Sequence, residues 1–365
     1  MTSLLQVLPT YDPAFGGPVS AALGVSASYE GVEDVTLTTV ACGPAGTGWS
    51  RHDTVSCRAY APPVARHVLS VSPGLVAWLV RRLRRFDLVH VHYNRGLVMI
   101  WVPLLAWLAG VPYVLQTHGM CRPWRGPLAL VDRLFTRPAI RRAHAVLVLG
   151  EAERDQILGI VPRANTVVVH NAVRAPEARP DAAPEPGAGP RLLFCARLHP
   201  RKGLARFLDV VERLAPEHPG LEGHVVGPDE GALAAARERV AAAGLPVTFH
   251  GGLDRDGVDR AMAGSDVLLH PAPREPFGMS MIEAFAADLP VVAAASSELA
   301  GVFAAEGAAL LPADDDVEAW VAAVRRVVTD PGTAADLRAG GRAVLERNFS
   351  RASLTRTLAG VVHAV

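Results

Sequence analysis

Lysine is almost absent from this chain of 365 residues. Lysine and arginine together number 36, yet Lys202 is the only lysine. A bias towards arginine, such as codon composition can cause, explains the depletion. It does not explain why the one remaining lysine stands in the segment Arg197-Leu-His-Pro-Arg-Lys-Gly203. Because an ammonium group is a compact point charge, Lys202 becomes a candidate functional residue.

Cysteine motifs and long apolar runs are also scarce. The four cysteines are Cys42, Cys57, Cys121 and Cys195. Their spacing is neither paired nor of a metal-binding type, which favours a reducing, cytoplasmic compartment. No basic and then apolar signal opens the chain, so we expect no secretory leader. The most apolar run, 97–109, is too short to span a bilayer, and we interpret it as a buried helix, with an interfacial helix as the alternative.

Net charge is zero, but it is unevenly distributed. Residues 1–180 carry 18 basic and 11 acidic side chains (+7), whereas residues 181–365 carry 18 and 25 (−7). Two domains with different partners explain this asymmetry, and so does attraction between the halves. A helix expected over 73–85 ends in an arginine cluster. Those arginines either complement the helix C-terminus or form a patch for an anionic acceptor or for the inner face of a membrane.

Apolar strands alternate with helical segments along both halves of the chain. This alternation predicts an α/β protein with two doubly wound, Rossmann-like parallel sheets. Residues 42–67, rich in proline, glycine and arginine, are expected to be irregular. Between the halves, 174–190 has the composition of a linker. We therefore predict an N-terminal domain over 1–173, a linker over 174–190, a second domain over 191–348 and a separate last segment over 349–365.

A turn and a helix start lie between two apolar runs of the second half, 266–270 and 289–293. The runs have the length of buried strands, and a Pro-Phe-Gly turn follows the first. The helix that begins there leaves backbone N–H groups free, and such a helix end attracts anions, phosphate above all. These N–H groups would belong to Phe277, Gly278 and Met279.

Two glutamates flank this turn. Glu275 precedes the helix and Glu283 lies about one turn inside it, so both can face the crevice at the carboxyl end of the strand. Carboxylates beside an anion site suit hydroxyl groups, whose protons they accept. A sugar nucleotide offers a diphosphate and hydroxyls together. The alternative is that both glutamates are ordinary surface residues.

Three other features suit a ligand site. Gly16 and Gly17 lie in a glycine-rich loop between a strand and a helix, an arrangement that binds phosphate but often is only a turn. The planar guanidinium of Arg197 can donate two parallel hydrogen bonds, and the ammonium of Lys202 is a point charge. Together they can neutralise a diphosphate. His118 ends an apolar strand, where it is well placed in a cleft, although a lone histidine is more often structural.

Taken together, these segments resemble the retaining glycosyltransferases of family 4, which have the GT-B fold of two Rossmann-like domains facing a central cleft. The chain departs from the family's usual pattern at two places: it has Ala172 where the family commonly has glycine, and Ser296-Ser297 where the family commonly has two glycines before an acidic residue. The matching segments are Phe15-Gly16-Gly17-Pro18, Thr117-His118-Gly119, Asn171-Ala172-Val173, Arg197 with Lys202-Gly203, Gly227, and Glu275-Pro-Phe-Gly-Met-Ser-Met-Ile-Glu283-Ala284 with Leu289-Pro-Val-Val.

The resemblance implies a nucleotide-diphosphate sugar as donor and an acceptor hydroxyl on a small molecule, a saccharide or a lipid-linked compound. Arg197 and Lys202 would stabilise the leaving diphosphate. Glu283 would bind the ribose hydroxyls and Glu275 the donor sugar, while the backbone of 277–279 would meet the phosphate and sugar. No nucleic acid partner is expected.

The resemblance also implies that His118 lies at the transferred sugar and that Gly16 and Gly17 close over the phosphates. The final helix would cross back onto the first domain. The acceptor would attack from the leaving-group side and pass its proton to a phosphate oxygen, so the configuration is retained and no dedicated base is needed.

No metal or other cofactor is expected. Asp254-Arg255-Asp256 is similar to the metal-binding Asp-x-Asp of a different transferase fold, but we expect Asp254 to cap a helix instead. Two alternatives to a transferase stay open. One is a sugar-nucleotide epimerase or hydrolase on the same scaffold, and the other is a non-catalytic protein that binds sugar nucleotides.

Overall fold

The computed structural model describes residues 1–11, 17–42, 53–57, 71–121, 123–124, 126, 128–172 and 189–365. The chain divides into two compact units. The first unit comprises Met1–Ala172 together with Arg351–Val365, and the second comprises Val173–Ser350. Each unit is built on one parallel sheet, which confirms the predicted fold class of two α/β domains.

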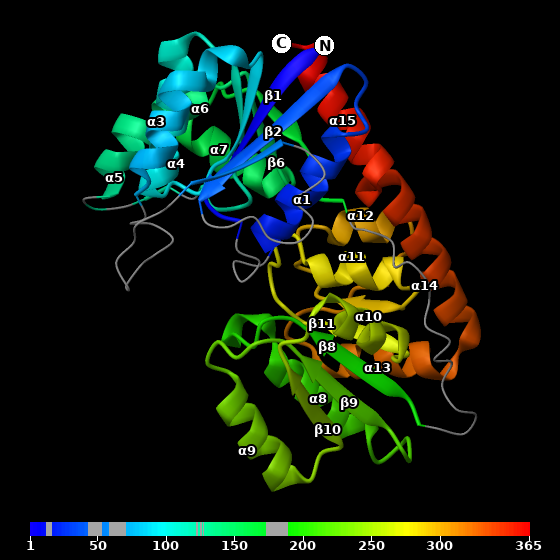
Figure 1. The fold of residues 1–365 in the computed structure, drawn as a ribbon. Helices are drawn as coiled ribbons and strands as arrows, with labels where there is room; N and C mark the ends of the chain where they lie inside the picture. The colour runs from blue at the N-terminus through cyan, green and yellow to red at the C-terminus, as the bar shows by residue number, and fades with distance from the viewer. Residues whose placement is uncertain are drawn as a thin grey trace. The chain divides into compact units, whose positions relative to one another are not determined.

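The first unit has a seven-stranded sheet in the order β3-β2-β1-β4-β5-β6-β7. Figure 1 labels three of its strands, β1, β2 and β6. Every residue of its central strands β4, β5 and β6 is buried, which is typical of a parallel sheet with both faces covered. The strands are β1 (Thr2–Leu8), β2 (Val35–Cys42), β3 (Asp53–Cys57), β4 (Leu88–His92), β5 (Tyr113–Gln116), β6 (Ala145–Val148) and β7 (Thr166–Val168).

Strand β3 corrects the expectation that 42–67 is irregular throughout. It pairs in parallel with β2 at the edge of the sheet, with Cys57 opposite Cys42. Its sequence, Asp-Thr-Val-Ser-Cys, has no apolar run, because an edge strand needs few buried side chains. The backbone hydrogen bonds to β2, and not hydrophobic patterning, therefore define this strand.

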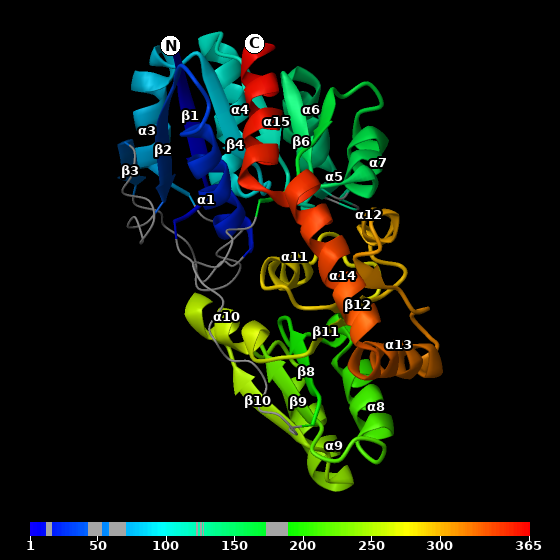
Figure 2. The ribbon, with the colours of Figure 1, turned by 90° about the vertical axis from the view of Figure 1, so that its right-hand side faces the viewer.

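Helices cover both faces of the first sheet. Among them, α15 lies along α1, as two views show (Figure 1 and Figure 2), and Leu354 and Leu358 join Val25 and Tyr29 in one apolar cluster. The helical segments are α1 (Gly17–Tyr29), α3 (Pro73–Arg82), η2 (Leu83–Arg85), α4 (Leu97–Ala109), α5 (Leu128–Val131), η3 (Asp132–Thr136), α6 (Arg137–Arg142), α7 (Glu151–Ile160) and α15 (Arg351–His363).

Helix α4 differs from the buried helix that its composition predicted. Val98, Met99 and Val102 face the sheet, but Trp101 and Leu108 are 45% and 61% exposed. A helix that covers one face of a sheet buries only one side, so an all-apolar sequence leaves apolar groups on the other. In the part of the chain that the structure describes, no helix combines the length and the hydropathy that a bilayer span requires.

The second unit has a six-stranded parallel sheet in the order β10-β9-β8-β11-β12-β13. Its strands are β8 (Arg191–Cys195), β9 (Glu222–Val226), β10 (Val247–Gly251), β11 (Val267–His270), β12 (Val291–Ala293) and β13 (Ala309–Leu310). Its helical segments are η4 (Pro200–Lys202), α8 (Leu204–Leu214), α9 (Leu233–Ala243), α10 (Arg255–Ala263), α11 (Met279–Ala286), α12 (Ala300–Ala305), α13 (Val317–Thr329), α14 (Pro331–Val344) and η5 (Leu345–Phe349).

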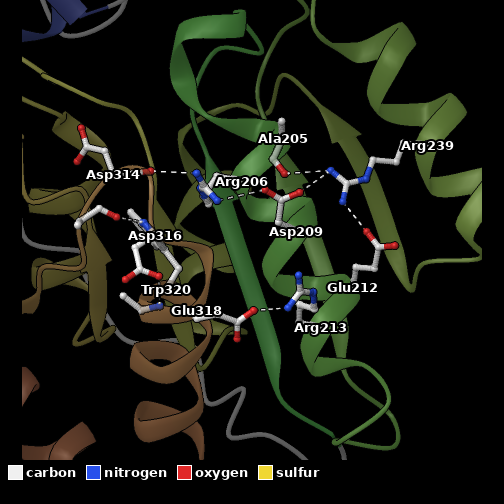
Figure 3. A network of polar contacts seen from close by, with 12 residues as sticks. Ala205, Arg206, Asp209, Glu212, Arg213, Arg239, Asp314, Asp316, Glu318 and Trp320 are labelled. Atoms are coloured by element: carbon white, nitrogen blue, oxygen red, sulfur yellow. Dashed lines mark hydrogen bonds and ion pairs between the residues drawn. The ribbon is translucent and has the colours of Figure 1, made fainter.

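Helix α8 is attached to its neighbours by a network of polar contacts (Figure 3). Arg239 of α9 contacts Asp209 at 2.8 Å and Glu212 at 2.5 Å, and Arg213 pairs with Glu318 at the start of α13. The apolar face of the same helix, which includes Phe207 and Val211, packs into the core. The helix that follows the Lys202 loop is thus held on two sides, which fixes where that loop ends.

Candidate functional site

The strongest cluster of predicted site residues lies in the second unit, at the carboxyl ends of two neighbouring strands. Strand β8 leads through η4 to Lys202, and β11 leads to Glu275. The Lys202 Nζ and the Glu275 Oε2 are 2.6 Å apart, although the residues are 73 positions apart in the sequence. Both side chains are largely buried, with 16% and 10% exposed. Parallel strands place their ends at one sheet edge, and this brings the pair together.

Gly203 allows this approach. Its φ is +77°, in the left-handed region, and a Cβ built there would lie 2.3 Å from the carbonyl oxygen of Pro271. Only glycine lets the η4 loop pass so close to the chain that leaves β11. The Lys-Gly pair in the sequence therefore has a steric reason, because the glycine sets the lysine against Glu275.

Glu275 is ionised at neutral pH despite its burial. Burial alone would raise the pKa of its carboxyl group, but the adjacent His270 ring and the Lys202 ammonium outweigh this effect and lower the pKa to about 2. The His270 Nε2 lies 3.5 Å from Oε2, too far for a good hydrogen bond. His270, which ends β11 and is 3% exposed, was not identified from the sequence, where it reads only as the last residue of an apolar strand.

The predicted anion site is the turn before α11. Gly278 is the N-cap residue of this helix, with φ +65°, and no side-chain hydrogen bond caps the N-terminus among the described residues. The Met281 N–H donates to the Gly278 carbonyl oxygen at 2.9 Å, and the backbone N–H groups at such a helix start are those that suit an anion. The His270 Nε2 faces this turn at 3.4 Å from a Cβ built on Gly278, and this buried nitrogen has no hydrogen-bond partner among the described residues. Phe277 is buried and Met279 half-buried beside it.

Glu283 and Arg197 each form an ion pair with a partner other than Lys202 or Glu275. The Glu283 Oε1 lies 2.5 Å from Nη1 of Arg255, and the Arg197 Nη1 lies 2.7 Å from Glu230. Burial raises the pKa of Glu283 although Arg255 opposes this. Burial and then the Glu283 charge raise the pKa of Cys195, the last residue of β8, to about 12.

His118 belongs to the first unit, where it lies at the end of a stack of three imidazole rings. The ring centroids of His90 and His92 are 4.6 Å apart, and those of His92 and His118 are 5.1 Å apart. Burial lowers the pKa of His118 to about 4, and burial with the neighbouring rings lowers the pKa of His90 to about 3 and that of His92 well below its usual value. All three rings are therefore neutral near pH 7.

Glu153 of α7 holds the loop that carries His118, which has φ +49°. Its Oε1 accepts hydrogen bonds from the Thr117 hydroxyl and the Gly119 N–H, both at 2.5 Å, and its Oε2 accepts one from the Leu149 N–H at 2.7 Å. This buried acid was not identified from the sequence. The available signal was a glutamate in the first turn of a helix, which is common for reasons of helix stability alone.

The other residues considered in the sequence are Gly16, Gly17 and Asp254. Gly16 lies outside the described residues, and Gly17 is the first residue of α1. The Asp254 side chain accepts a hydrogen bond from the Gly257 N–H at 2.8 Å, so the predicted helix cap is confirmed. Among the residues that the structure describes, no three acidic, histidine or cysteine side chains are grouped as metal ligands.

Comparison with known proteins identifies related sequences for both units. The family described as Glycosyl transferase 4-like domain matches residues 16–172, and that described as Glycosyl transferases group 1 matches residues 177–344. The 2-deoxystreptamine N-acetyl-D-glucosaminyltransferase of Streptomyces fradiae is 32% identical over 275 residues, 69% of this chain and 65% of that protein. The chain thus aligns with just under two thirds of that relative's length.

A second relative and a solved structure extend the comparison. The 2-deoxystreptamine glucosyltransferase of Streptomyces kanamyceticus is 31% identical over 287 residues, 72% of this chain and 73% of that protein. The crystal structure of Alr3699/HepE from Anabaena in complex with UDP-glucose has a TM-score of 0.75 at 18% identity and covers 100% of both chains. The two proteins therefore have a similar fold over the whole length of both chains.

Proposed function

Because the chain belongs to the family 4 glycosyltransferases, which have the GT-B fold, we propose that it transfers a sugar from a nucleotide-diphosphate donor to an acceptor hydroxyl. The observation that carries this proposal is the contact of Lys202 with Glu275 beside the uncapped start of α11. A cation and free N–H groups suit a diphosphate, and a carboxylate that stays ionised suits the hydroxyls of a sugar.

In this proposal Lys202 stabilises the charge that develops on the leaving diphosphate. The Arg197 side chain is 58% exposed, so its guanidinium can exchange Glu230 for a phosphate at little cost. Glu283 would bind ribose hydroxyls once Arg255, which is 46% exposed, turns towards solvent. Positive charge from the protein would then replace a metal, and we propose that transfer is metal-independent.

We propose retention of configuration, and the support is where the acceptor's proton can go. Glu275, with a pKa of about 2, and His118, with a pKa of about 4, are both weak bases near neutral pH. A phosphate oxygen of the leaving group is the stronger candidate to accept the proton. Attack from the leaving-group side would bring the acceptor hydroxyl to that oxygen, and the new bond would form on the same face of the sugar.

For the acceptor we propose an aminocyclitol, a carbocycle with amino and hydroxyl groups, because the two relatives are named for 2-deoxystreptamine.

We also propose a cytoplasmic protein whose first unit makes peripheral contact with an anionic membrane. In support, Trp101 contacts Phe135 at 6.1 Å, and the Arg142 guanidinium lies 4.4 Å from the Trp107 ring. Exposed aromatic rings beside arginines are typical of interfacial surfaces. Flotation with vesicles tests this contact: more protein should float with anionic lipid than with zwitterionic lipid. Recovery of the same amount in the floating fraction without lipid would exclude it.

The transfer reaction is tested in two steps. A thermal-shift screen against UDP, GDP, ADP and TDP sugars identifies the donor, because a ligand of the folded state raises the melting temperature. Transfer is then measured with and without acceptor in the presence of a chelator, and the anomer formed is identified by NMR. Turnover without acceptor would favour an epimerase or hydrolase. Full biological activity in Glu275→Ala, with the donor still bound, would favour the non-catalytic alternative.

A further inference from the structure

The buried polar residues beneath His118 form a chain of hydrogen bonds with a defined direction. Gln6 of β1 is fully buried, and its Nε2 lies 3.1 Å from the Ala22 carbonyl oxygen and 2.8 Å from the His92 Nε2. The His92 Nδ1 in turn lies 2.8 Å from the His118 Nε2. One amide thus connects, through one imidazole ring, to a predicted site residue.

The Ala22 carbonyl determines which way the Gln6 amide points. A carbonyl oxygen only accepts hydrogen bonds, so the amide atom beside it must be the NH2 group. The amide oxygen then accepts from the Thr39 hydroxyl at 3.1 Å and lies 2.5 Å from the Ser26 hydroxyl, whose single proton also faces the Ala22 carbonyl oxygen at 2.9 Å. The opposite orientation would place two oxygens 3.1 Å apart with no proton between them.

This orientation propagates to His118. Because the Gln6 NH2 group donates to the His92 Nε2, that nitrogen must carry a lone pair. A neutral His92 then has its proton on Nδ1 and donates it to the Nε2 of His118. His118 in turn carries its proton on Nδ1, which makes no hydrogen bond within the described part of the chain. That nitrogen is the one left for a ligand.

We propose that Gln6 and His92 are positioning residues that fix the tautomer of His118, so that it presents an Nδ1–H donor and not a basic nitrogen. The group it would meet is an oxygen acceptor, which under the proposed function is a hydroxyl oxygen of the transferred sugar. The assignment of the tautomer is independent of that function. The assignment of its partner rests on it.

Long-range proton–nitrogen NMR on full-length protein labelled with 15N-histidine tests the tautomer. For the unmodified protein near neutral pH, we expect a pyrrole-type Nδ1 and a pyridine-type Nε2 for His118, assigned by its loss in His118→Asn. The reverse pattern would overturn the inference. This measurement needs neither a donor nor an acceptor.

Variants test the chain itself. Gln6→Met removes the amide, and His92→Phe keeps a stacked ring but removes its nitrogens. Either should release His118 to a mixture of tautomers and lower kcat/KM by about threefold to tenfold, the effect of one neutral hydrogen bond. Tyr29→Phe is the matched control, because its hydroxyl lies 2.8 Å from the Nδ1 of His90, at the far end of the stack from His118. An unchanged His118 pattern in folded Gln6→Met would contradict the positioning role.

The outcomes separate this inference from the proposed function. The expected tautomer in a protein that transfers no sugar would overturn the proposed function and leave the tautomer assignment intact. The reverse tautomer in an active transferase would overturn this inference alone.

Discussion

The two units place a histidine at the end of the corresponding strand and surround it differently. His92 ends β4 and His270 ends β11, and each of these strands follows the first strand of its unit in the order of the sheet. His92 contacts the neutral groups of Gln6 and His118. His270 faces the ionised Glu275, which in turn contacts Lys202. Similar topology therefore supports a neutral hydrogen-bond chain in one unit and a cluster of full charges in the other.

Under the proposed function, the difference matches what each cluster would meet. A diphosphate needs a cation, and a buried cation needs an acid to compensate it until the ligand binds. A sugar hydroxyl needs only a directed donor or acceptor, which neutral groups supply without the cost of desolvating an ion. We therefore expect the second unit to depend on charge and the first on hydrogen-bond direction.

The largest expected effect is on catalysis in the second unit. Lys202→Met should lower kcat about a thousandfold, because the charge on the leaving diphosphate loses its stabilising cation. Arg201→Met is the matched control, since Arg201 is exposed and adjacent in sequence, and it should retain most activity. Lys202→Met should also lower the melting temperature, because it leaves the buried Glu275 carboxylate without its cation. The double variant Lys202→Met with Glu275→Gln should regain that melting temperature but not the lost kcat. A kcat within tenfold of the original for Lys202→Met would contradict the role assigned to charge.

Acid should destabilise the first unit at a higher pH than the second. The folded pKa values of His118 and His90, about 4 and about 3, lie below the usual value of about 6.5. Their contribution to stability is complete above about pH 6.5 and is lost as the pH falls through these values. For His118 alone the loss is about 3 kcal/mol.

The contribution of Glu275 lies in a lower pH window. Its folded pKa of about 2 lies below the unfolded value of about 4.3, so its contribution is complete above about pH 4.3 and is lost as the pH falls towards 2. Hydrogen exchange followed by mass spectrometry between pH 7 and 3.5 should show the first unit opening at the higher pH. Glu275→Gln should leave that first opening unchanged. Earlier opening of the second unit would contradict the comparison.

A glycine pair tests the geometry of the charged cluster. Gly244→Ala should cost about 1 kcal/mol, because its φ of +59° is strained for alanine but a Cβ there meets nothing within 4 Å. Gly203→Ala should cost about 2 kcal/mol more, because its Cβ meets the backbone of Pro271. Urea unfolding measures both. Equal costs would mean that the η4 loop can shift to accommodate the added methyl group. The contact of Lys202 with Glu275 would then not depend on Gly203.

The smallest effect is expected at the surface of the second unit. Arg213 and Glu318 form an ion pair whose side chains are 57% and 69% exposed (Figure 3). Arg213→Gln should therefore change the free energy of unfolding by less than about 1 kcal/mol. Arg239→Gln should cost more, since it removes contacts to Asp209 and Glu212 together. A larger effect at Arg213 would show that exposed charges also determine stability in this unit.

Much of the fold was predictable, because it depends on patterns that are local in the sequence. The apolar run of β11, the Pro-Phe-Gly turn and the start of α11 at Met279 were all readable, since strand, turn and helix signals follow one another within a few residues. Strand β3 was missed because its pairing with β2, and not its own side chains, defines it. The apolar exposed face of α4 was missed because composition does not reveal which side of a helix is covered.

The chain's own residues determined two parallel-sheet units, a turn suited to an anion and a single lysine beside a glycine. Only the tertiary structure decided that Lys202 contacts Glu275, that Arg255 contacts Glu283 and that Gln6 reaches His118 through His92. Each of these contacts joins residues on different strands or loops. Protonation and hydrogen-bond direction depend on such neighbours at a few ångströms, and neighbours far apart in sequence are set by the packing of the sheets.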